Sequence, residues 1–562
     1  MKKLLFIAVV LCLSASLSAE QKKDWGRVSA SLESLNHVYV DDAANGFYPM
    51  SDPQMRQLKN RYATNNYLKV DYYKGRVAAG MQMEGYFPTV AGYPYVHNKL
   101  TISNLYFSWI DKSYSVTAGT FYEQLGSGML FRSWEDRTLG LNNALLGVRG
   151  TYNYNDIFAL RAFYGIPRLD KTMMPAQTGI FGLGLTNVHF AAADASFSLS
   201  ECLGWERVSL GIEGSALYKH ENLSAWMPEQ AGCKDDNISY SARVNMDVDG
   251  FYLKGEYVGA GLQYVPSKSK AENGNAQMLE FGYNSKGLGV SVTTRRMHRM
   301  LQQIYTESIR KNGNEFVSYH PAANVISYCP AMCTQYTYML TTLNPYSIMR
   351  ASGLTSTGEA GGQIDAFYNF RRGTRIGGKR GMKVHANFST YYSLNAEGGF
   401  KGGEHLFTDF SVDVERQWTK KFKMTLLYSL QDYNKKEKDY KKEEVHVGMS
   451  HAFVADLLYK WTSKFSTRLE LQYLASKGYQ KDWMAALLEV SFAPHWSVFA
   501  SDMYNHGSSR MHYYNAGVSY AYKWIRVAAG YGRYRAGYIC SGGVCREIPA
   551  YTGANITLTA TF

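Results

Sequence analysis

The sequence predicts an all-β fold, a transmembrane antiparallel β-barrel of about 24 strands with short periplasmic turns and long extracellular or inward-folded loops. Three observations support this prediction. Runs of about ten residues alternate apolar and polar side chains, as in 145–154 and 157–165 around the tight turn at Asn155 and Asp156. Short and long connections alternate along the chain. The final residues, 555–562, alternate strictly, and 551–562 is predicted to be the strand that closes the barrel.

Composition agrees with one large barrel better than with several soluble domains. The chain has 562 residues, with 45 Tyr, 51 Gly and only 13 Pro. No internal apolar run reaches the ~18 residues that a membrane-spanning helix needs. Because large barrels often form a single domain, we expect residues 20–562 to be one outer-membrane barrel.

The first residues have the features of a secretory signal peptide, which we place at residues 1–19. Lys2 and Lys3 precede an apolar run at 4–13, and small residues follow it up to Ala19. Removing the two lysines lowers the formal net charge from +13 to +11, and removing Cys12 leaves six of the seven cysteines. We therefore predict an integral, multi-pass protein of the cell outer membrane, with cysteines that pass through an oxidising compartment.

Two kinds of connection follow one another along the predicted strands. The first hairpin, 67–73 with 76–86, turns at Lys74 and Gly75. Further tight turns are expected at 111–112, 155–156, 203–204, 249–250, 285–287, 377–378, 419–420, 462–463, 493–494 and 523–524. Longer connections are expected at 41–61, 87–98, 122–143, 167–179, 220–235, 266–275, 297–360 and 536–550. Seven of the ten tryptophans fall at or next to the short-turn ends, which is typical of an aromatic belt at one membrane interface.

Residues 122–143 lack strand alternation and are predicted to fold into the lumen. Gly126 and Gly128 are expected to shape this loop. Its charged residues are candidates for a pore constriction, since opposed charges across a narrow aqueous lumen select solutes: Glu123, Arg132, Glu135, Asp136 and Arg137. In the alternative interpretation these charges pair with one another and with the wall only to hold the loop. The sequence around Ser127 lacks the glycine spacing of a nucleophile elbow, so we predict no enzyme activity.

Residues 297–360 form too long a segment for a plain turn. Met297, Met300 and Ile304 have helical spacing, so a lid or plug over the lumen is one interpretation, and an exposed surface loop is the other. Four arginines are candidates for a basic patch in the lumen, or for simple solvated charges: Arg295, Arg296, Arg299 and Arg546.

The cysteine pattern favours disulfides over a metal site. In the loop 535–550, Cys540 and Cys545 flank a Gly-Gly turn, and Cys329 and Cys333 have a similarly short spacing. Pairing within each loop or between the two loops is compatible with the sequence. Cys202 and Cys233 lie in connections at opposite rims and should not pair with each other. No His or carboxylate set completes a zinc pattern, so we expect neither a metal nor a cofactor.

Three stretches of the chain carry a family resemblance: 119–150, with its Gly-Thr-Phe-Tyr-Glu-Gln-Leu-Gly-Ser-Gly start; 333–346, from Cys-Thr-Gln-Tyr-Thr-Tyr to Asn-Pro-Tyr; and 531–550, ending in Gly-Gly-Val-Cys-Arg-Glu-Ile-Pro-Ala. They resemble a Bacteroidota family of outer-membrane porin-like β-barrels of unknown function. The resemblance covers the mature chain. It implies the barrel fold and the outer-membrane location, and it implies no substrate.

The function predicted from these observations is a porin-like channel for polar solutes, passive or gated by inward-folded loops. The alternative is a plugged barrel that serves as docking platform or accessory subunit for a surface lipoprotein or a secretion system. An import receptor with an N-terminal plug domain is disfavoured, because strand alternation begins by Arg27. Expected partners are outer-membrane lipid and the barrel-assembly machinery, which would recognise the terminal strand ending at Phe562. The mixed-charge run at 435–444 is predicted to be a solvated loop. No nucleic acid is expected as a partner.

Overall fold

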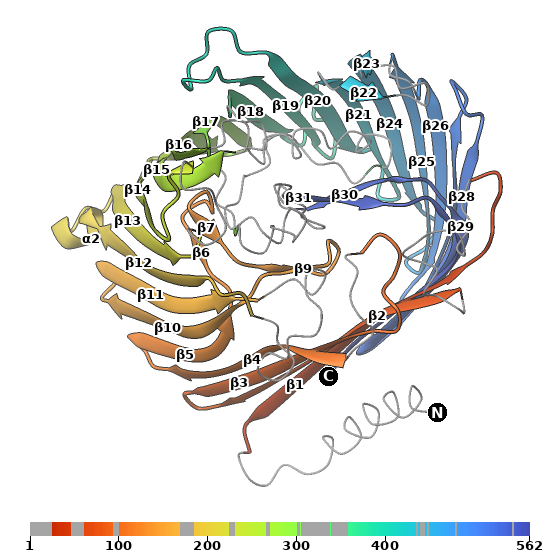
Figure 1. Cartoon of the computed structure of the whole chain (residues 1–562). Coiled ribbons are helices and arrows are strands. Elements are labelled where there is room, and N and C mark those ends of the chain that lie inside the picture. Colours follow the sequence, from red (N-terminus) through yellow and green to blue (C-terminus); the bar gives the residue numbers. More distant parts are fainter. Residues whose placement is uncertain are drawn as a thin grey trace.

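The computed structural model shows one closed barrel of 24 antiparallel strands (Figure 1). It describes residues 25–45, 61–93, 100–168, 185–223, 231–265, 270–300, 304, 338, 358–433, 436–438, 444–446, 449–477, 480–541 and 544–562. The first strand, β1 (Arg27–Tyr39), pairs on one side with β2 (Tyr62–Lys74) and on the other with the last strand, β32 (Tyr551–Thr561). The predicted strand number and the antiparallel arrangement are confirmed. The predicted signal peptide lies outside the described residues.

Every other strand of the barrel pairs with its neighbours along the chain. These strands are β3 (Val77–Tyr86), β4 (Leu100–Ile110), β5 (Tyr114–Phe121), β10 (Leu145–Tyr154), β11 (Phe158–Pro167), β12 (His189–Ser198), β13 (Val208–His220), β14 (Asp236–Val248), β15 (Phe251–Val265), β16 (Lys270–Ser285), β17 (Leu288–His298), β18 (Glu359–Phe370), β19 (Met382–Ser393), β20 (His405–Gln417), β21 (Phe422–Tyr433), β24 (Met449–Lys460), β25 (Phe465–Ser476), β26 (Trp483–Phe492), β27 (Trp496–Asn505), β28 (His512–Tyr522) and β29 (Ile525–Tyr534).

Four small two-stranded sheets are separate from the sheet that forms the barrel. They are β6 (Gln124–Leu125) with β7 (Phe131–Arg132), β8 (Glu135–Asp136) with β9 (Leu141–Asn142), β22 (Lys436–Lys438) with β23 (Glu444–His446), and β30 (Gly537–Ser541) with β31 (Val544–Ile548). Figure 1 shows β6, β7, β9, β30 and β31 inside the ring of strands.

Alternation along each strand separates an apolar outer face from a polar inner face. On β10 and β11, Val148 and Leu160 are exposed on the outside, whereas Arg149 and Arg161 make ion pairs inside the barrel. Successive strand side chains point to opposite faces, so this division follows directly from the sequence pattern. A barrel surrounded by lipid requires such an apolar outer face.

Most of the predicted tight turns occur at one rim of the barrel. Asn155 and Asp156 both have positive φ, at 49° and 59°, as a two-residue hairpin turn with the twist of its strands requires. Two predicted turns differ. Between β18 and β19 the connection runs over residues 371–381 and is not a tight turn. Between β12 and β13 the chain forms a short helix, α2 (Leu199–Leu203), before Gly204. The Ser198 side chain caps that helix by accepting a hydrogen bond from the Glu201 N–H, a local alternative that serine offers to a plain turn. Among the described residues, no helix is long and apolar enough to cross a membrane.

The last residue is held at the seam where the barrel closes. The Phe562 ring packs on Trp524 with ring centroids 4.7 Å apart, and its backbone N–H donates to the Ala30 carbonyl oxygen at 2.8 Å. The side chain and the backbone of Phe562 therefore both contribute to the closed ring. Recognition of this residue by assembly machinery stays a prediction.

We predict that Phe562→Ala lowers the amount of folded barrel in the outer membrane several-fold. Both Phe562→Ala and the matched control Trp524→Ala lose the ring contact, worth about 1 kcal/mol, but only the first loses the terminal aromatic residue. Folded protein is measured in membranes by heat-modifiable migration on gels. Equal yields for the two variants would contradict recognition of the terminal residue.

Candidate functional site

The first half of the loop 122–143 has an apolar core of its own inside the lumen. Leu125, Met129, Leu130 and Phe131 are at most 1% exposed. They pack against inward-facing residues of the barrel wall: Phe163 on β11, Phe190 on β12, Leu217 on β13 and Val258 on β15. These wall positions replace the polar residues typical of a barrel interior, so the loop is docked on a matching apolar patch.

Gly126 and Gly128 lie at the tip of this hairpin. Both have positive φ, at 57° and 95°. A Cβ atom on Gly126 would lie 2.3 Å from Glu256 Oε1, which is closer than real Cβ atoms approach. The next backbone N–H, that of Ser127, donates to Glu256 Oε2 at 3.1 Å. The glycine therefore lets the loop backbone bind a carboxylate of the wall strand β15.

Glu123 anchors the start of the loop to two arginines of the wall. Its carboxylate lies 2.5 Å from Arg149 Nε on β10 and 3.1 Å from Arg161 Nη1 on β11. The Glu123 side chain is only 1% exposed. Burial raises the pKa of the Glu123 carboxyl above its usual value, although Arg161 and Arg149 oppose that shift.

The ion pairs continue along the wall beyond Glu123. Arg161 Nη2 lies 2.7 Å from Asp194 on β12, and Asp194 lies 2.5 Å from Arg243 Nη2 on β14. Arg243 also binds Glu213 on β13, with Nε 2.7 Å from Oε2. This row of wall residues was not predicted from the sequence. Their positions on the inward face of consecutive strands were the available signal.

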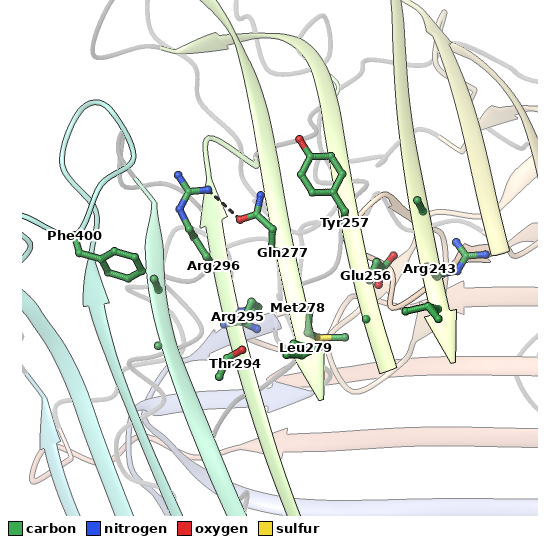
Figure 2. Close-up of a pocket in the computed structure, with 15 residues that line it drawn as sticks. Arg243, Glu256, Tyr257, Gln277, Met278, Leu279, Thr294, Arg295, Arg296 and Phe400 are labelled. Atoms are coloured by element: carbon green, nitrogen blue, oxygen red, sulfur yellow. Dashed lines mark hydrogen bonds between the residues drawn. The ribbon is translucent and has the colours of Figure 1, made fainter. Parts of the chain in front are cut away.

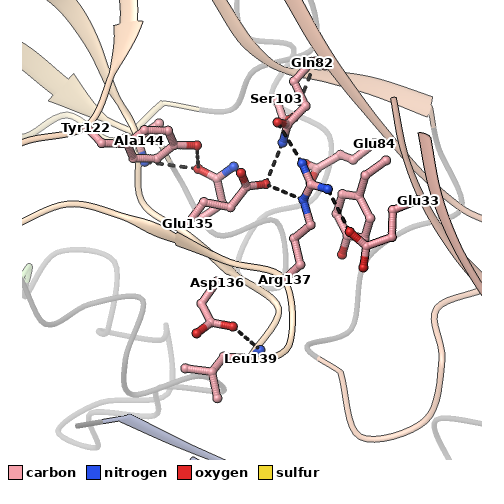
Figure 3. A network of polar contacts seen from close by, with 12 residues as sticks. Glu33, Gln82, Glu84, Ser103, Tyr122, Glu135, Asp136, Arg137, Leu139 and Ala144 are labelled. Carbon is pink, nitrogen blue, oxygen red and sulfur yellow. Dashed lines mark hydrogen bonds and ion pairs between the residues drawn. The ribbon is translucent and has the colours of Figure 1, made fainter. Parts of the chain in front are cut away.

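The second half of the loop binds the wall at β1 and β3, which β4 and β5 separate from β10 (Figure 3). Arg137 Nη1 lies 2.9 Å from Glu33 on β1, and Arg137 Nη2 donates to Gln82 Oε1 on β3 at 3.2 Å. The Gln82 amide in turn donates to Glu135 at 2.5 Å, and the Arg137 guanidinium lies 4.8 Å from the centroid of the Tyr67 ring. The loop is thus attached to β1–β3 on one side and to β10–β15 on the other.

The two remaining candidates for the constriction act within the loop. The Arg132 guanidinium lies over the Trp134 ring, 4.4 Å from its centroid. Asp136 accepts a hydrogen bond from the Leu139 N–H at 3.1 Å. Four of the five candidates therefore make contacts that hold the loop together or fix it to the wall. The fifth, Arg132, lies against the ring of Trp134.

Three inward segments meet in the lumen. Trp134, Leu139 and Leu141 of the loop pack with Ile539 of β30. From β31, Arg546 donates through Nε to the Thr138 carbonyl oxygen at 3.2 Å. The same guanidinium lies 3.8 Å from the centroid of the Tyr93 ring, which belongs to the connection between β3 and β4.

Two described residues of the long segment 297–360 also lie against the inner wall. Ile304 is buried in the cluster that surrounds the loop hairpin. The Tyr338 hydroxyl donates to Asp456 Oδ2 on β24 at 3.4 Å. Most of the segment, with Cys329 and Cys333, lies outside the described residues, so its role as lid or plug stays a prediction.

The four arginines predicted as a basic patch have separate partners. Arg295 lies 2.5 Å from Glu359 on β18, and both side chains are almost fully buried. Arg299 pairs with Glu272 on β16. Among the described residues, the acceptors bound by Arg296 are neutral, and Arg546 contacts the loop as described above. These contacts tie most of the four charges to structural partners.

The cysteines of the loop 535–550 face each other in the backbone register. Cys540 and Cys545 are directly opposed residues of the antiparallel pair β30 and β31. Opposed residues in such a pair have Cα atoms about 4.5 to 5.5 Å apart, within the range that a disulfide spans. The disulfide stays a prediction. Cys202 and Cys233 are both free, and the described part of the chain holds no group of three or more potential metal ligands.

The closed ring of strands with folded loops in its lumen defines the class: a large antiparallel barrel of the outer-membrane type. The chain belongs to the family of unknown function DUF6029, which it matches over residues 1–562. No curated protein matches this sequence.

The chain is similar to solved structures at low sequence identity. A chain of the E. coli P pilus tip assembly intermediate PapC-PapD-PapK-PapG superposes with a TM-score of 0.50 at 10% identity, covering 97% of this chain and 62% of that chain. OpdK of Pseudomonas aeruginosa, solved with vanillate, gives a TM-score of 0.35 at 11% identity over 80% of this chain and 98% of that chain. The siderophore receptor PirA of Pseudomonas aeruginosa gives 0.37 at 9% identity, over 96% and 81% respectively.

We predict that Arg137→Gln lowers the free energy of unfolding by about 1 to 2 kcal/mol. The variant loses charged hydrogen bonds to the wall, worth roughly 1.5 to 3 kcal/mol when fully buried, and partial exposure of Arg137 reduces that value. Denaturant unfolding in detergent measures the change. The exposed Arg526 of β29 provides the control, since Arg526→Gln should stay within about 0.5 kcal/mol of wild type. An Arg137→Gln protein that unfolds at the wild-type denaturant concentration would contradict the anchoring role.

Proposed function

We propose that the protein is a porin-like channel for polar solutes in the outer membrane, with the loop 122–143 as its constriction. The observation that carries this proposal is the attachment of the loop to two flanks of the inner wall, through Glu123 at one end and Arg137 at the other. Large barrels enclose a lumen that must be filled or must conduct. A loop fixed in this way narrows the lumen at a defined place.

The outer surface supports the placement in a membrane. Large apolar side chains are exposed on the outward face around the barrel, Val148 and Leu488 among them. The seven tryptophans at the short-turn rim are all exposed, as an aromatic belt at the lipid interface requires: Trp25, Trp109, Trp205, Trp418, Trp461, Trp496 and Trp524. We place the short-turn rim on the periplasmic side and the long loops outside.

The inner wall away from the loop supports a water-filled path. His385 on β19 is bound between Asp365 at 2.8 Å and Asp413 at 2.7 Å, on the neighbouring strands β18 and β20. Arg468 on β25 binds Asp456 and Glu470, at 3.0 and 2.5 Å. Charged groups on inward strand positions are typical of barrels with an aqueous lumen.

The test is the single-channel conductance of the variant that lacks residues 124–136. We predict a several-fold larger conductance than that of wild type, because the deletion removes β6, β7 and β8 from the lumen. Both proteins are compared in planar bilayers after heat-modifiable migration has shown that they are folded. A folded deletion variant with unchanged conductance would refute the constriction.

We also predict that acidification from neutral pH toward the usual glutamate pKa lowers the open probability of the channel. The pKa of the Glu123 carboxyl is raised while the loop is folded inward, because the carboxyl is buried there. In an exposed loop this carboxyl would have its usual pKa. The inward state therefore binds protons more readily. Protonation of the Glu123 carboxyl therefore stabilises the inward-folded loop. This stabilisation is complete at a pH below the usual glutamate pKa, and it is lost as the pH rises through the raised pKa of Glu123.

In Glu123→Gln this part of the pH dependence should disappear, and the channel should keep its low-pH behaviour at every pH. Open probability is read from single-channel records across the pH range. The exposed residue Glu404 provides the control, because the open probability of the Glu404→Gln channel should depend on pH as that of wild type does. The same pH dependence in Glu123→Gln and in wild type would contradict the assignment.

A second candidate function is a plugged barrel that docks a surface lipoprotein or a secretion-system subunit. The observation that favours it is the meeting of three inward segments at Trp134, Ile539 and Tyr93. Silence of both wild type and the folded deletion variant in bilayers would favour this candidate over the channel, and cross-linking in cells would then identify the partner.

A further inference from the structure

A groove of about 780 Å³ crosses the wall of the barrel from β14 to β18 (Figure 2). It lies on the outer face. Tyr257 and Leu279, which line it, are 42% and 48% exposed, whereas Glu256 and Met278 beside them are turned to the lumen side of the same strands. Because side chains alternate along a strand, the outward residues form the groove and the inward ones supply only backbone to its floor.

The floor of the groove is made of small outward residues, and larger side chains rise around it. Ala242, Gly255, Thr294 and Ala360 occupy the outward positions of β14, β15, β17 and β18. Phe400, from the connection between β19 and β20, stands at the rim and is 68% exposed. An apolar trough bounded by Tyr257, Leu279 and Phe400 has the shape and chemistry to hold an acyl chain.

Arg296 supplies a positive charge at the end of this groove. Its Nη1 donates to Asn275 Oδ1 at 2.6 Å and to Gln277 Oε1 at 3.0 Å, and its Nη2 donates to the Gly398 carbonyl oxygen at 2.6 Å. All of these acceptors are neutral. The neighbouring Arg295 and Arg299 each pair with a carboxylate instead. The charge of Arg296 is therefore fixed in place by its partners but is not neutralised by them.

The height of Arg296 in the barrel matches the boundary of the lipid. It follows the first residue of β17, Leu288, by eight positions (288 to 296). With about 3.3 Å per residue and a strand tilt of about 40°, it lies roughly 20 Å from the short-turn rim. The apolar band of such barrels is about 25 Å tall. The guanidinium is thus near the level of the headgroups in the leaflet on the long-loop side.

We propose that this groove is a specific site for one phosphate-bearing lipid of that leaflet, with an acyl chain along the groove and the phosphate at Arg296. The proposal rests on the membrane placement in the proposed function and is independent of conduction through the lumen. A guanidinium binds phosphate oxygens through two parallel N–H bonds and keeps its charge at every physiological pH. The small floor residues let the chain approach the wall closely, which buries apolar surface.

Native mass spectrometry of the full chain in detergent tests the site. The probes are phosphatidylglycerol and phosphatidylcholine with the same acyl chains, which differ in net headgroup charge. We expect wild type to retain phosphatidylglycerol about ten-fold better, the preference that about 1.4 kcal/mol produces. Arg296→Gln should lose this preference, whereas Arg207→Gln, at an exposed position next to the short turn before β13, should keep it.

A second variant tests the groove itself without touching the charge. Thr294→Trp fills the floor at an exposed outward position of β17 and should reduce retention of both lipids. Heat-modifiable migration shows that each variant is folded. Equal retention of the two lipids by wild type, or an undiminished preference in folded Arg296→Gln, would overturn the proposal. Unchanged conductance in Arg296→Gln keeps this result separate from the test of the channel.

Discussion

The pairing of β1 with β32 is the constraint on which the rest of the structure depends. It joins the two ends of the 24-stranded sheet, so that no strand edge is left exposed. In lipid an unpaired edge would cost several kcal/mol for each backbone group. Closure also divides the side chains of every strand into an outer set and a lumenal set. The composition of each set then fits its own surroundings.

The lumenal set explains why charged residues are used to hold the inward loop. Glu123, Arg161 and Asp194 lie on the inner wall, where each charge has an opposite charge beside it, and their pairs fix the loop without contact with lipid. The outer set is largely apolar. There Arg296 stands out as a charge held by neutral acceptors beside an apolar groove, near the level of the headgroups.

The sequence predicted the parts of the structure that depend on local periodicity. Strand number, the turn at Asn155 and the inward loop with Gly126 follow from alternation and from turn chemistry. The partners of the loop did not follow, because Arg137 meets Glu33 across strands separated by about a hundred residues and several connections. The separate partners of the four arginines did not follow either, for a related reason: Arg295 and Arg296 are adjacent in sequence, and adjacent strand residues point to opposite faces.

The central claim is that polar solutes pass through the lumen past the loop. Swelling of liposomes that contain the purified, folded protein tests it directly, with uncharged sugars of increasing size as solutes. The account predicts rapid swelling with the smallest sugars and a size cut-off well below that of an unobstructed 24-strand barrel. Absence of swelling with every sugar, from protein shown to be folded, would contradict it.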